Sequence, residues 1–361
     1  MTAVMCGKLR ACAVFVLLIS FLASGCAQED ASKSGNTGVA GQKTVVSEKQ
    51  LASGKDCAIE EFFPINVNDS EQWLLVRGKD LSKPVILYLH GGPGSSLVPF
   101  AHAATNRLVD EFIVVYWDQR GAGLSYSDRI SPETMNVNQF IDDTKVVTRY
   151  LKERFKKEKI YILGHSWGSV LGTLVVQKYP EDYYAYIGVG QVVNTEIQQR
   201  EGVEWLKRQI LTKGTQEEKE LIPDMENNNH APRYLLKKYG GLAHNITGSR
   251  LAEIMKQSPY YPEKYTGELY AKGGRLASNI WYNEVAEINF FEQVPELKVP
   301  VYFFLGRYDY VTPTPSVEEY CKVLKAPNKE IVWFELSAHR MDVEEPEKFQ
   351  SGITDIARKH K

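Results

Sequence analysis

Cysteine is scarce in this chain: five occur among 361 residues, at positions 6, 12, 26, 57 and 321. No two of them form a C-x-x-C pair, and no spacing among them suits zinc. We therefore expect no metal site and no cofactor. Three of the five fall in the first 26 residues, and the two in the main body, Cys57 and Cys321, are predicted to be free thiols.

An excess of charge of either sign is also absent. The 43 lysines and arginines nearly balance the 45 aspartates and glutamates, which gives a formal net charge of -2. Such a balance gives no indication of a nucleic-acid partner. Hydrophobic residues at 43 % are ordinary for a globular protein, and the length suits one large α/β domain with an insertion, or two domains.

The apolar run at 11–23 is too short to span a bilayer comfortably. It follows Lys8 and Arg10 and leads into Ala23-Ser24-Gly25-Cys26, so residues 1–26 are typical of an export signal. The end of this segment resembles the lipobox of bacterial lipoproteins, although alanine stands where that motif prefers leucine. The resemblance implies a lipid anchor on Cys26 and a place in the bacterial cell envelope. An ordinary signal peptide of a secreted or periplasmic protein, or an uncleaved anchor, is the alternative.

Residues 27–55 are rich in Ser, Gly, Lys, Gln and Ala, with few large apolar groups, and are predicted to be a flexible tether. The two apolar alternations that follow, Glu60 to Val67 and Gln72 to Val76, are joined by Asn-Asp-Ser. This pattern predicts an antiparallel hairpin at the edge of a sheet.

Nearly continuous apolar runs at 84–89, 112–117 and 160–163 are typical of strands that are buried on both faces. Between the last two lies 138–157, where large apolar residues recur at helical spacing and charges occupy the other side. Strands that alternate with helices predict a mostly parallel sheet with helices on both faces, an α/β fold.

About a hundred residues separate the next two predicted strands, 185–190 and 299–305. They have helical patterning, many charges and several interrupting prolines. We therefore predict an α/β core of 56–193 and 294–361 with a helical cap inserted at 194–293. A cap would lie over the carboxyl ends of the strands, where open α/β sheets bind ligands.

The segment Gly164-His165-Ser166-Trp167-Gly168 places a serine between a predicted strand and a predicted helix. A serine at such a turn needs neighbours without side chains, which the two glycines provide. Its hydroxyl would lie at the start of a helix, where unpaired N–H groups favour negative charge. The bare pattern is common by chance, but the flanking strand and helix favour a nucleophile.

A serine nucleophile needs a base and a third group that orients the base. His339 follows a further predicted strand at 330–335, and Asp309 follows the strand before it, 299–305. A loop histidine is most often structural, and an aspartate in a turn most often a cap. The order Ser166, Asp309, His339, with each residue after a strand, instead favours the catalytic triad of an α/β-hydrolase.

The oxyanion of a tetrahedral intermediate needs two fixed donors. Trp167, directly after the serine, would supply one backbone N–H, and Gly92 in His90-Gly91-Gly92-Pro93-Gly94 would supply the other. A glycine cluster after a strand is also found in plain turns and phosphate loops. Neither Gly-x-Gly-x-x-Gly nor a following Gly-Lys-Ser/Thr is present, which argues against a phosphate loop.

These motifs, with Asp118-Gln-Arg-Gly-Ala-Gly-Leu-Ser125, resemble the proline iminopeptidase family of α/β-hydrolases over about 60–193 and 294–350. The resemblance implies Ser166 as nucleophile, Asp309 and His339 as the rest of the triad, and an oxyanion hole of Gly92 and Trp167. Asp118 and Arg120 match a loop that we expect to support the site structurally. One position departs from the family, because His165 stands where it usually has glycine.

An aminopeptidase must also bind a free ammonium, which the resembled family does with acidic cap residues. Here Glu201 and Glu204 are the preferred candidates, with Glu196 and Glu284 as others. Each is individually more typical of a solvated surface. An apolar slot for a proline-like ring is predicted from four aromatic residues, Trp205, Tyr260, Tyr261 and Trp281, with core packing as the alternative.

The expected activity is that of a serine aminopeptidase that releases N-terminal proline or another small residue from short peptides through an acyl-enzyme. An α/β-hydrolase that acts on esters, amides or lactones without a free amine is the first alternative. A non-catalytic binding protein on the same fold is the second, since fold alone does not determine function.

Overall fold

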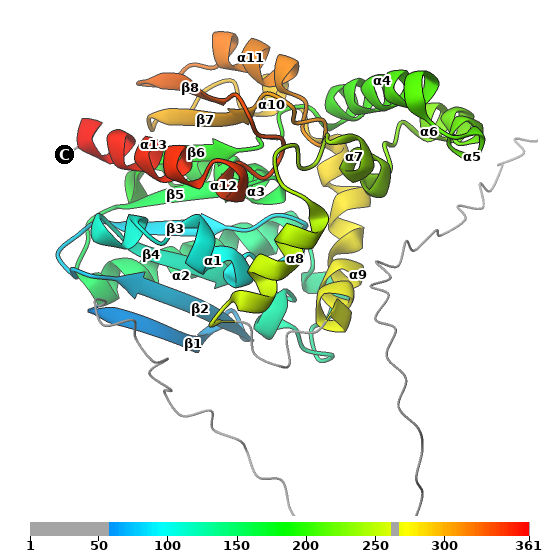
Figure 1. Cartoon of the computed structure of the whole chain (residues 1–361). Helices are drawn as coiled ribbons and strands as arrows, with labels where there is room; N and C mark the ends of the chain where they lie inside the picture. The colour runs from blue at the N-terminus through cyan, green and yellow to red at the C-terminus, as the bar shows by residue number, and fades with distance from the viewer. Residues whose placement is uncertain (1–57, 261–266, 361) are drawn as a thin grey trace, which may run out of the picture. The chain divides into compact units, whose positions relative to one another are not determined.

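A computed structural model describes residues 58–260 and 267–360 (Figure 1). The predicted export signal, the anchor on Cys26 and the tether lie outside the described residues. Eight described strands form one sheet in the order β1-β2-β4-β3-β5-β6-β7-β8. Strand β2 is antiparallel to both of its neighbours, β1 and β4, and all other neighbouring strands are parallel. The prediction of a mostly parallel sheet is confirmed.

The strands follow the apolar runs closely, since four of the six parallel strands consist of buried residues alone. Strand β6 has one exposed residue, Tyr184, and the edge strand β8 is partly exposed. The predicted hairpin is also present, with a two-residue turn at Asn68 (φ 44°) and Asp69 (φ 61°) that suits its strand twist. The bounds are β1 Ile59–Val67, β2 Ser70–Gly78, β3 Val85–Leu89, β4 Ile113–Asp118, β5 Ile160–His165, β6 Tyr183–Val189, β7 Val301–Gly306 and β8 Lys329–Phe334.

Helices cover both faces of the sheet, because alternate residues of each buried strand enter two different apolar clusters. In β3, Leu87 joins the cluster under α2 and α3, whereas Tyr88 joins the cluster under α1 and α13. Figure 1 shows α1, α12 and α13 together on one side of the sheet. The bounds are α1 Ala101–Ala104, α2 Val137–Phe155, α3 Trp167–Lys178, α11 Thr314–Val323, α12 Met341–Glu344 and α13 Pro346–Lys359.

Between β6 and β7 the described chain forms helices and no named strand. Only the first part of this insertion, α4 to α7, has an apolar cluster of its own. In contrast, Ile254 of α8 and Ile280 of α9 belong to the two clusters of the sheet. Within the predicted cap range 194–293, helices α4 to α7 therefore pack around their own cluster, whereas α8 and α9 pack against the sheet. The bounds are α4 Thr195–Lys213, α5 Gln216–Glu220, α6 Ile222–Asn228, α7 Arg233–Tyr239, α8 Gly248–Gln257, α9 Gly267–Asn283 and α10 Phe290–Gln293.

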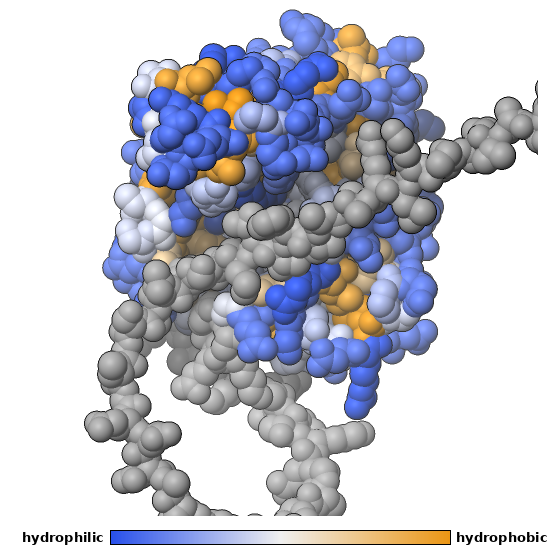
Figure 2. All heavy atoms as spheres, turned by 90° about the vertical axis from the view of Figure 1, so that its right-hand side faces the viewer, coloured by the Kyte–Doolittle hydropathy of each residue, from blue (hydrophilic) through white to orange (hydrophobic). Residues whose placement is uncertain are grey.

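Figure 2 looks onto the end of the molecule where α4, α7 and α9 lie, and most of the visible surface there is hydrophilic, with small apolar patches. No helix of the described ranges is both long enough and apolar enough to cross a membrane. The single cysteine in these ranges, Cys321, is a half-buried free thiol, as predicted, and Cys57 falls outside them.

Arg120 and Asp143 form a buried ion pair that joins the hairpin to α2. The guanidinium donates to both carboxylate oxygens of Asp143, at 2.8 and 3.0 Å. The same carboxylate accepts from the side-chain amides of Asn68, Gln72 and Gln139. This network agrees with the structural role that we predicted for Arg120 from its sequence motif.

Replacing Arg120 with methionine leaves the Asp143 carboxylate buried without a counter-charge. Loss of one partner of a buried pair costs about 3–5 kcal/mol. We expect the free energy of unfolding to fall by this amount in urea titrations. The control Arg250→Met removes the exposed pair with Glu253 and should change it by less than about 0.5 kcal/mol. Equal effects of the two changes would contradict the structural role.

Candidate active site

Ser166 stands on a sharp turn between β5 and α3, with φ of 56° and ψ of -118°. The turn depends on its flanking glycines. A Cβ on Gly164 would lie 2.1 Å from the carbonyl oxygen of Gly168, and a Cβ on Gly168 would lie 2.2 Å from that of Leu89. No side chain fits in such gaps. The expected strand, turn and helix are therefore present, with the serine at the apex.

His339 and Asp309 are in contact beyond the ends of β8 and β7. The Nδ1 of His339 lies 2.8 Å from Oδ2 of Asp309. Asp309 is itself held by the backbone N–H groups of Val311 and Thr312, each 2.9 Å from Oδ1, and by the Thr312 hydroxyl. Because Nδ1 donates to the carboxylate, Nε2 carries the lone pair. This Nε2 is buried and has no hydrogen-bond partner in the described part of the chain.

The serine and the histidine both lie beside the carboxyl end of β6. The backbone N–H of Ser166 donates to the carbonyl of Val189, at 2.9 Å. The next residue, Gly190, lies under the imidazole, since a Cβ there would be 2.8 Å from Nδ1 of His339. Among the described residues no hydrogen bond joins Ser166 Oγ to His339 Nε2. Such bonds are often long before substrate binds, so the missing bond does not argue against a serine–histidine pair.

The loop that contains Gly92 passes beside the nucleophile. A Cβ on Gly91 would lie 3.1 Å from Cβ of Ser166, so the loop backbone reaches the serine directly. Gly92 has φ of 116°, which favours glycine. Trp167 is the first residue of α3, and the N–H groups of a helix's first turn have no partner within the helix. Both predicted oxyanion donors thus belong to segments that meet at Ser166.

Gln119 joins these two segments, and sequence reasoning missed it. Its side-chain amide donates to the carbonyl of His90, at 3.1 Å, and its side-chain oxygen accepts from the indole N–H of Trp167, at 2.9 Å. Its backbone N–H donates to Nε2 of His90. The sequence offered a signal, because Gln119 lies between Asp118 and Arg120 in a motif that we had assigned to support.

Two further histidines near the serine are kept neutral by burial. The pKa of His165 falls to about 3 and that of His90 to about 4, in both cases chiefly because the imidazole is desolvated. The ring of His165 lies 4.7 Å from that of His339, and its Nε2 is 2.8 Å from the carbonyl oxygen of His339. The neutral His165 therefore donates its Nε2–H to the carbonyl of His339 and holds the loop of that residue in place.

The loop after α7 is bonded to both loops that carry the acid and the base. The backbone N–H of Tyr310 donates to the carbonyl of Gly241, at 2.9 Å, and that of His339 donates to the carbonyl of Leu242, at 3.2 Å. The insertion thus supplies acceptors to the segments that hold Asp309 and His339.

Glu344 strengthens this contact from the other side. One carboxylate oxygen accepts from the backbone N–H groups of His244, at 2.5 Å, and Asn245, at 2.6 Å, and the other accepts from that of Ala338, at 2.8 Å. Burial raises the pKa of this carboxyl. The carboxylate therefore ties the insertion to the residue before His339.

Comparison with known proteins decides the family. The model of the family described as "Serine aminopeptidase, S33" matches residues 81–346. The chain belongs to this serine aminopeptidase S33 family. It is 32 % identical to the "Probable aminopeptidase YbaC" of Bacillus subtilis (strain 168), over 82 % of this chain and 96 % of the relative. It is 26 % identical to a "Proline iminopeptidase" of Heyndrickxia coagulans, over 76 % and 90 %.

A solved structure agrees in fold. The proline iminopeptidase-related protein TTHA1809 from Thermus thermophilus matches with a TM-score of 0.61 at 20 % identity, over 84 % of this chain and 98 % of that chain. At this identity the likeness shows the fold alone. Together with the family match, it confirms the α/β-hydrolase fold that the motifs predicted. The family and the aminopeptidase names of the relatives support a hydrolase.

In the described ranges, no hydrogen bond or ion pair joins the acidic residues proposed for substrate binding to Ser166, Asp309 or His339. Glu201 lines a separate hollow of about 290 Å³ with residues of α10 and α11, and burial raises its pKa. Glu204 and Glu196 are exposed. The carboxylate of Glu284 accepts from the backbone N–H of Val137 and caps α2.

The three described residues of the predicted aromatic slot lie in different surroundings. Trp205 stacks on Tyr310, with ring centroids 4.1 Å apart, and so lies next to Asp309. Tyr260 is buried in a sheet cluster and its hydroxyl bonds Glu60, and Trp281 packs against the other sheet cluster. Tyr261 is outside the described residues.

Among the described residues, no group of three or more His, Cys, Asp or Glu could hold a metal ion.

Replacing Gln119 with leucine should weaken catalysis more than binding. The change removes both bonds that join the Gly92 loop to Trp167. Because loss of one oxyanion donor costs about 10²–10³ in kcat, mispositioning of both donors should lower kcat about tenfold or more with little change in KM. Steady-state kinetics check this, with the exposed Gln216→Leu as control. A rise in KM alone would contradict the role.

The neutral histidines should also make stability depend on pH. Below the ordinary pKa of about 6.5 the unfolded chain protonates His90 and His165, whereas the folded chain does not. The free energy of unfolding should therefore fall as pH falls below 6.5, by at most about 1.4 kcal/mol per pH unit for each histidine. Urea titrations at pH 7.0 and 5.5 measure the loss, and His165→Gln should reduce it. An unchanged loss in that variant would show that His165 is protonated when folded.

Proposed function

We propose that this protein is a serine aminopeptidase that releases N-terminal proline or another small residue from short peptides through an acyl-enzyme. The observation that carries the proposal is the pair at the end of β7 and β8. The imidazole of His339 is oriented by a firmly held Asp309, and its free Nε2 lies in the same strand-end region as Ser166.

In this mechanism Ser166 Oγ attacks the carbonyl carbon of the first peptide bond, and its proton passes to Nε2 of His339. Asp309 stabilises the imidazolium that forms. The backbone N–H groups of Gly92 and Trp167 stabilise the oxyanion. When the tetrahedral intermediate collapses, the C–N bond breaks and the leaving amine takes the proton from His339.

Deacylation reverses these roles. A water molecule gives its proton to His339 and attacks the acyl carbon, and the proton then returns to Ser166 Oγ as the amino acid leaves. The neutral His165 supports this cycle, because a second charged imidazole beside His339 would disfavour the imidazolium. The names of the two relatives, a probable aminopeptidase and a proline iminopeptidase, support the same substrate class.

A second candidate keeps the triad and drops the requirement for a free amine, so that esters, amides or lactones are the substrates. It is favoured by one observation: Glu201 lines a hollow whose lining includes no triad residue, and Glu204 is exposed. Burial of an ammonium without partner carboxylates is costly. Trp205, stacked on Tyr310, is then the one member of the predicted binding set that lies beside the site.

Ser166→Ala and His339→Ala should each lower kcat for prolyl arylamides by on the order of 10⁴-fold or more. Ser166→Ala should also abolish labelling by a fluorophosphonate, whereas the exposed Ser351→Ala should change neither. Under the leading proposal, N-acetylation of the prolyl substrate removes turnover. Equal turnover of free and acetylated substrates selects the second candidate. Folded wild-type protein that takes no label would overturn both.

A further inference from the structure

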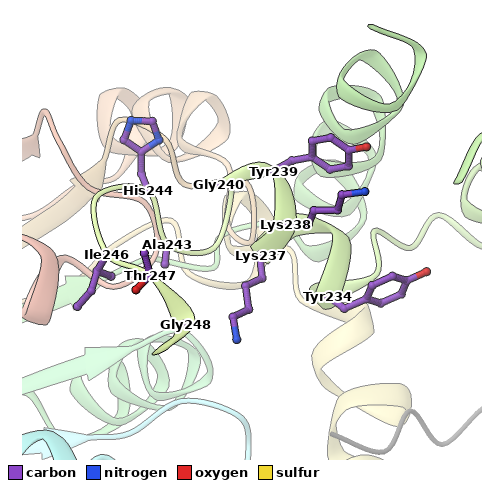
Figure 3. A pocket seen from close by; sticks show the side chains of 10 residues that line it. All are labelled: Tyr234, Lys237, Lys238, Tyr239, Gly240, Ala243, His244, Ile246, Thr247 and Gly248. Carbon is purple, nitrogen blue, oxygen red and sulfur yellow. The ribbon is translucent and has the colours of Figure 1, made fainter. Parts of the chain in front are cut away.

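The insertion approaches the catalytic loops at two places. One is the loop after α7, whose residues Gly240, Ala243 and His244 line a hollow of about 630 Å³ with the start of α8 (Figure 3). Among the described residues that line it, none belongs to the triad. In Figure 3 the labelled side chains spread outward and do not converge on a common point. The other approach is made by α9, and it reaches the loops that carry the oxyanion donors.

Helix α9 contains two adjacent glycines whose surroundings differ. Gly273 is buried, and a Cβ on it would lie 2.8 Å from the carbonyl oxygen of Gly121 and 3.0 Å from that of Gly94. A Cβ on Gly274 would meet no atom of the described residues within 4 Å. Apart from proline, glycine is the least favourable residue in a helix interior. The close approach to two loops accounts for the glycine at 273, and no described contact requires one at 274.

The first of these two is the glycine loop, residues 91–96, which supplies a predicted oxyanion donor. Its contact with α9 is mutual, because a Cβ on Gly94 would lie 2.6 Å from the carbonyl oxygen of Gly273. Gly94 follows Gly92 in a tight turn, since a Cβ on Gly92 would lie 2.7 Å from the backbone nitrogen of Gly94. The same turn passes beside the nucleophile. A shift at Gly94 is therefore passed on to the donor at Gly92.

The second loop follows β4 and supports the other donor. Gly121 lies two residues beyond Gln119, whose side chain joins the carbonyl of His90 to the indole of Trp167. A Cβ on Gly121, which has φ of 75°, would lie 2.9 Å from Cδ2 of Leu276 in α9. Residues three apart are neighbours on a helix surface. Both loops that orient the oxyanion donors therefore contact one face of α9.

Helix α9 is anchored on both sides of Gly273. On one side, the hydroxyl of Tyr270 donates to the carbonyl of Ser96, at 2.7 Å, and so joins the helix to the far end of the glycine loop. On the other, Ala277 and Ile280 are buried in a cluster of the sheet. An added methyl group at 273 would displace the two loops, or displace the helix together with the loop that is bonded to it.

We propose that Gly273 is a positioning residue for the oxyanion hole. Because it has no side chain, α9 lies directly against both loops and fixes the backbone N–H of Gly92 relative to Ser166. The inference rests on the acyl-enzyme chemistry of the proposed function, and it applies to peptides and esters alike, since both form an oxyanion. Such donors act only when they are placed at the developing charge, so a small displacement lowers the rate.

Gly273→Ala should lower kcat for prolyl arylamides about tenfold or more and change KM by less than about twofold, because the donors bind the transition state more strongly than the substrate. The rate at which a fluorophosphonate labels Ser166 should fall by a similar factor, since the oxygen of the reagent is stabilised by the same donors. Steady-state kinetics and a time course of labelling measure the two effects.

Gly274→Ala is the matched control, because it makes the same change one residue further along the helix, where the described residues leave room. It should leave kcat, KM and the labelling rate unchanged, and its thermal unfolding temperature should equal or exceed that of the wild type. A Gly273→Ala protein that unfolds at a lower temperature but keeps the wild-type kcat and labelling rate overturns the positioning role. A rise in KM alone overturns it as well.

Tyr270→Phe tests the same contact without added volume. The change removes the hydrogen bond to the carbonyl of Ser96 and should lower kcat and the labelling rate about fivefold, with KM unchanged. If Gly273→Ala does not fold, this variant gives the answer. Wild-type values of kcat and of the labelling rate in folded Tyr270→Phe then overturn the positioning role of α9.

A failure of the peptidase proposal is distinguishable, because labelling requires no peptide. If the wild-type protein is labelled but hydrolyses no peptide, the labelling rates of Gly273→Ala and Gly274→Ala compare the oxyanion holes directly. Slower labelling of Gly273→Ala alone supports the positioning role. Equal rates in all three proteins overturn it and leave the peptidase proposal untouched. Folded wild-type protein that takes no label overturns the positioning role together with the hydrolase.

Discussion

The structure depends on the close approach of backbone to backbone around Ser166. A residue with φ of 56° at the head of a helix is strained, and the strain is sustained because Gly164 and Gly168 let strand, turn and helix meet without side chains between them. The neighbouring strands are packed tightly on both sides, so the turn has little room to relax. The nucleophile is thereby held away from the sheet before any substrate arrives, and the loops after β3, β7 and β8 converge on it.

Much of this arrangement could be predicted from the sequence, because it is encoded locally. Continuous apolar runs gave the buried strands, helical spacing gave α2, and turn chemistry gave the hairpin at Asn68. Ser166, Asp309 and His339 were found because each follows a strand, and carboxyl ends of parallel strands share one edge. Gln119 and Glu344, which accepts from the backbone N–H of Ala338, form hydrogen bonds between distant segments. A local sequence pattern does not predict such bonds.

The insertion was the least predictable part for the same reason. Its helices were visible in the spacing of apolar residues, but the surfaces that they cover were not. Glu201, Glu204 and the aromatic residues were chosen for their chemistry, and the fold packs Tyr260 and Trp281 against two different clusters of the sheet. Trp205 is the exception, because it stacks on the residue next to Asp309. Recognition therefore depends on side chains whose direction is set by tertiary packing.

The bonds from Gly241 and Leu242 to the loops of Asp309 and His339 have a consequence for how such enzymes diversify. The helices α4 to α7 have an apolar cluster of their own, against which Tyr310 and Val311 of the acid loop pack. Exchange of that portion between homologous proteins therefore keeps the two clusters of the sheet and changes one contact of the acid loop. A crossover placed after Leu242 would instead replace the loop whose main-chain carbonyls accept from the acid and base loops. Natural or laboratory chimaeras should therefore tolerate junctions before this loop, and new specificities can arise by recombination there without rebuilding the chemistry.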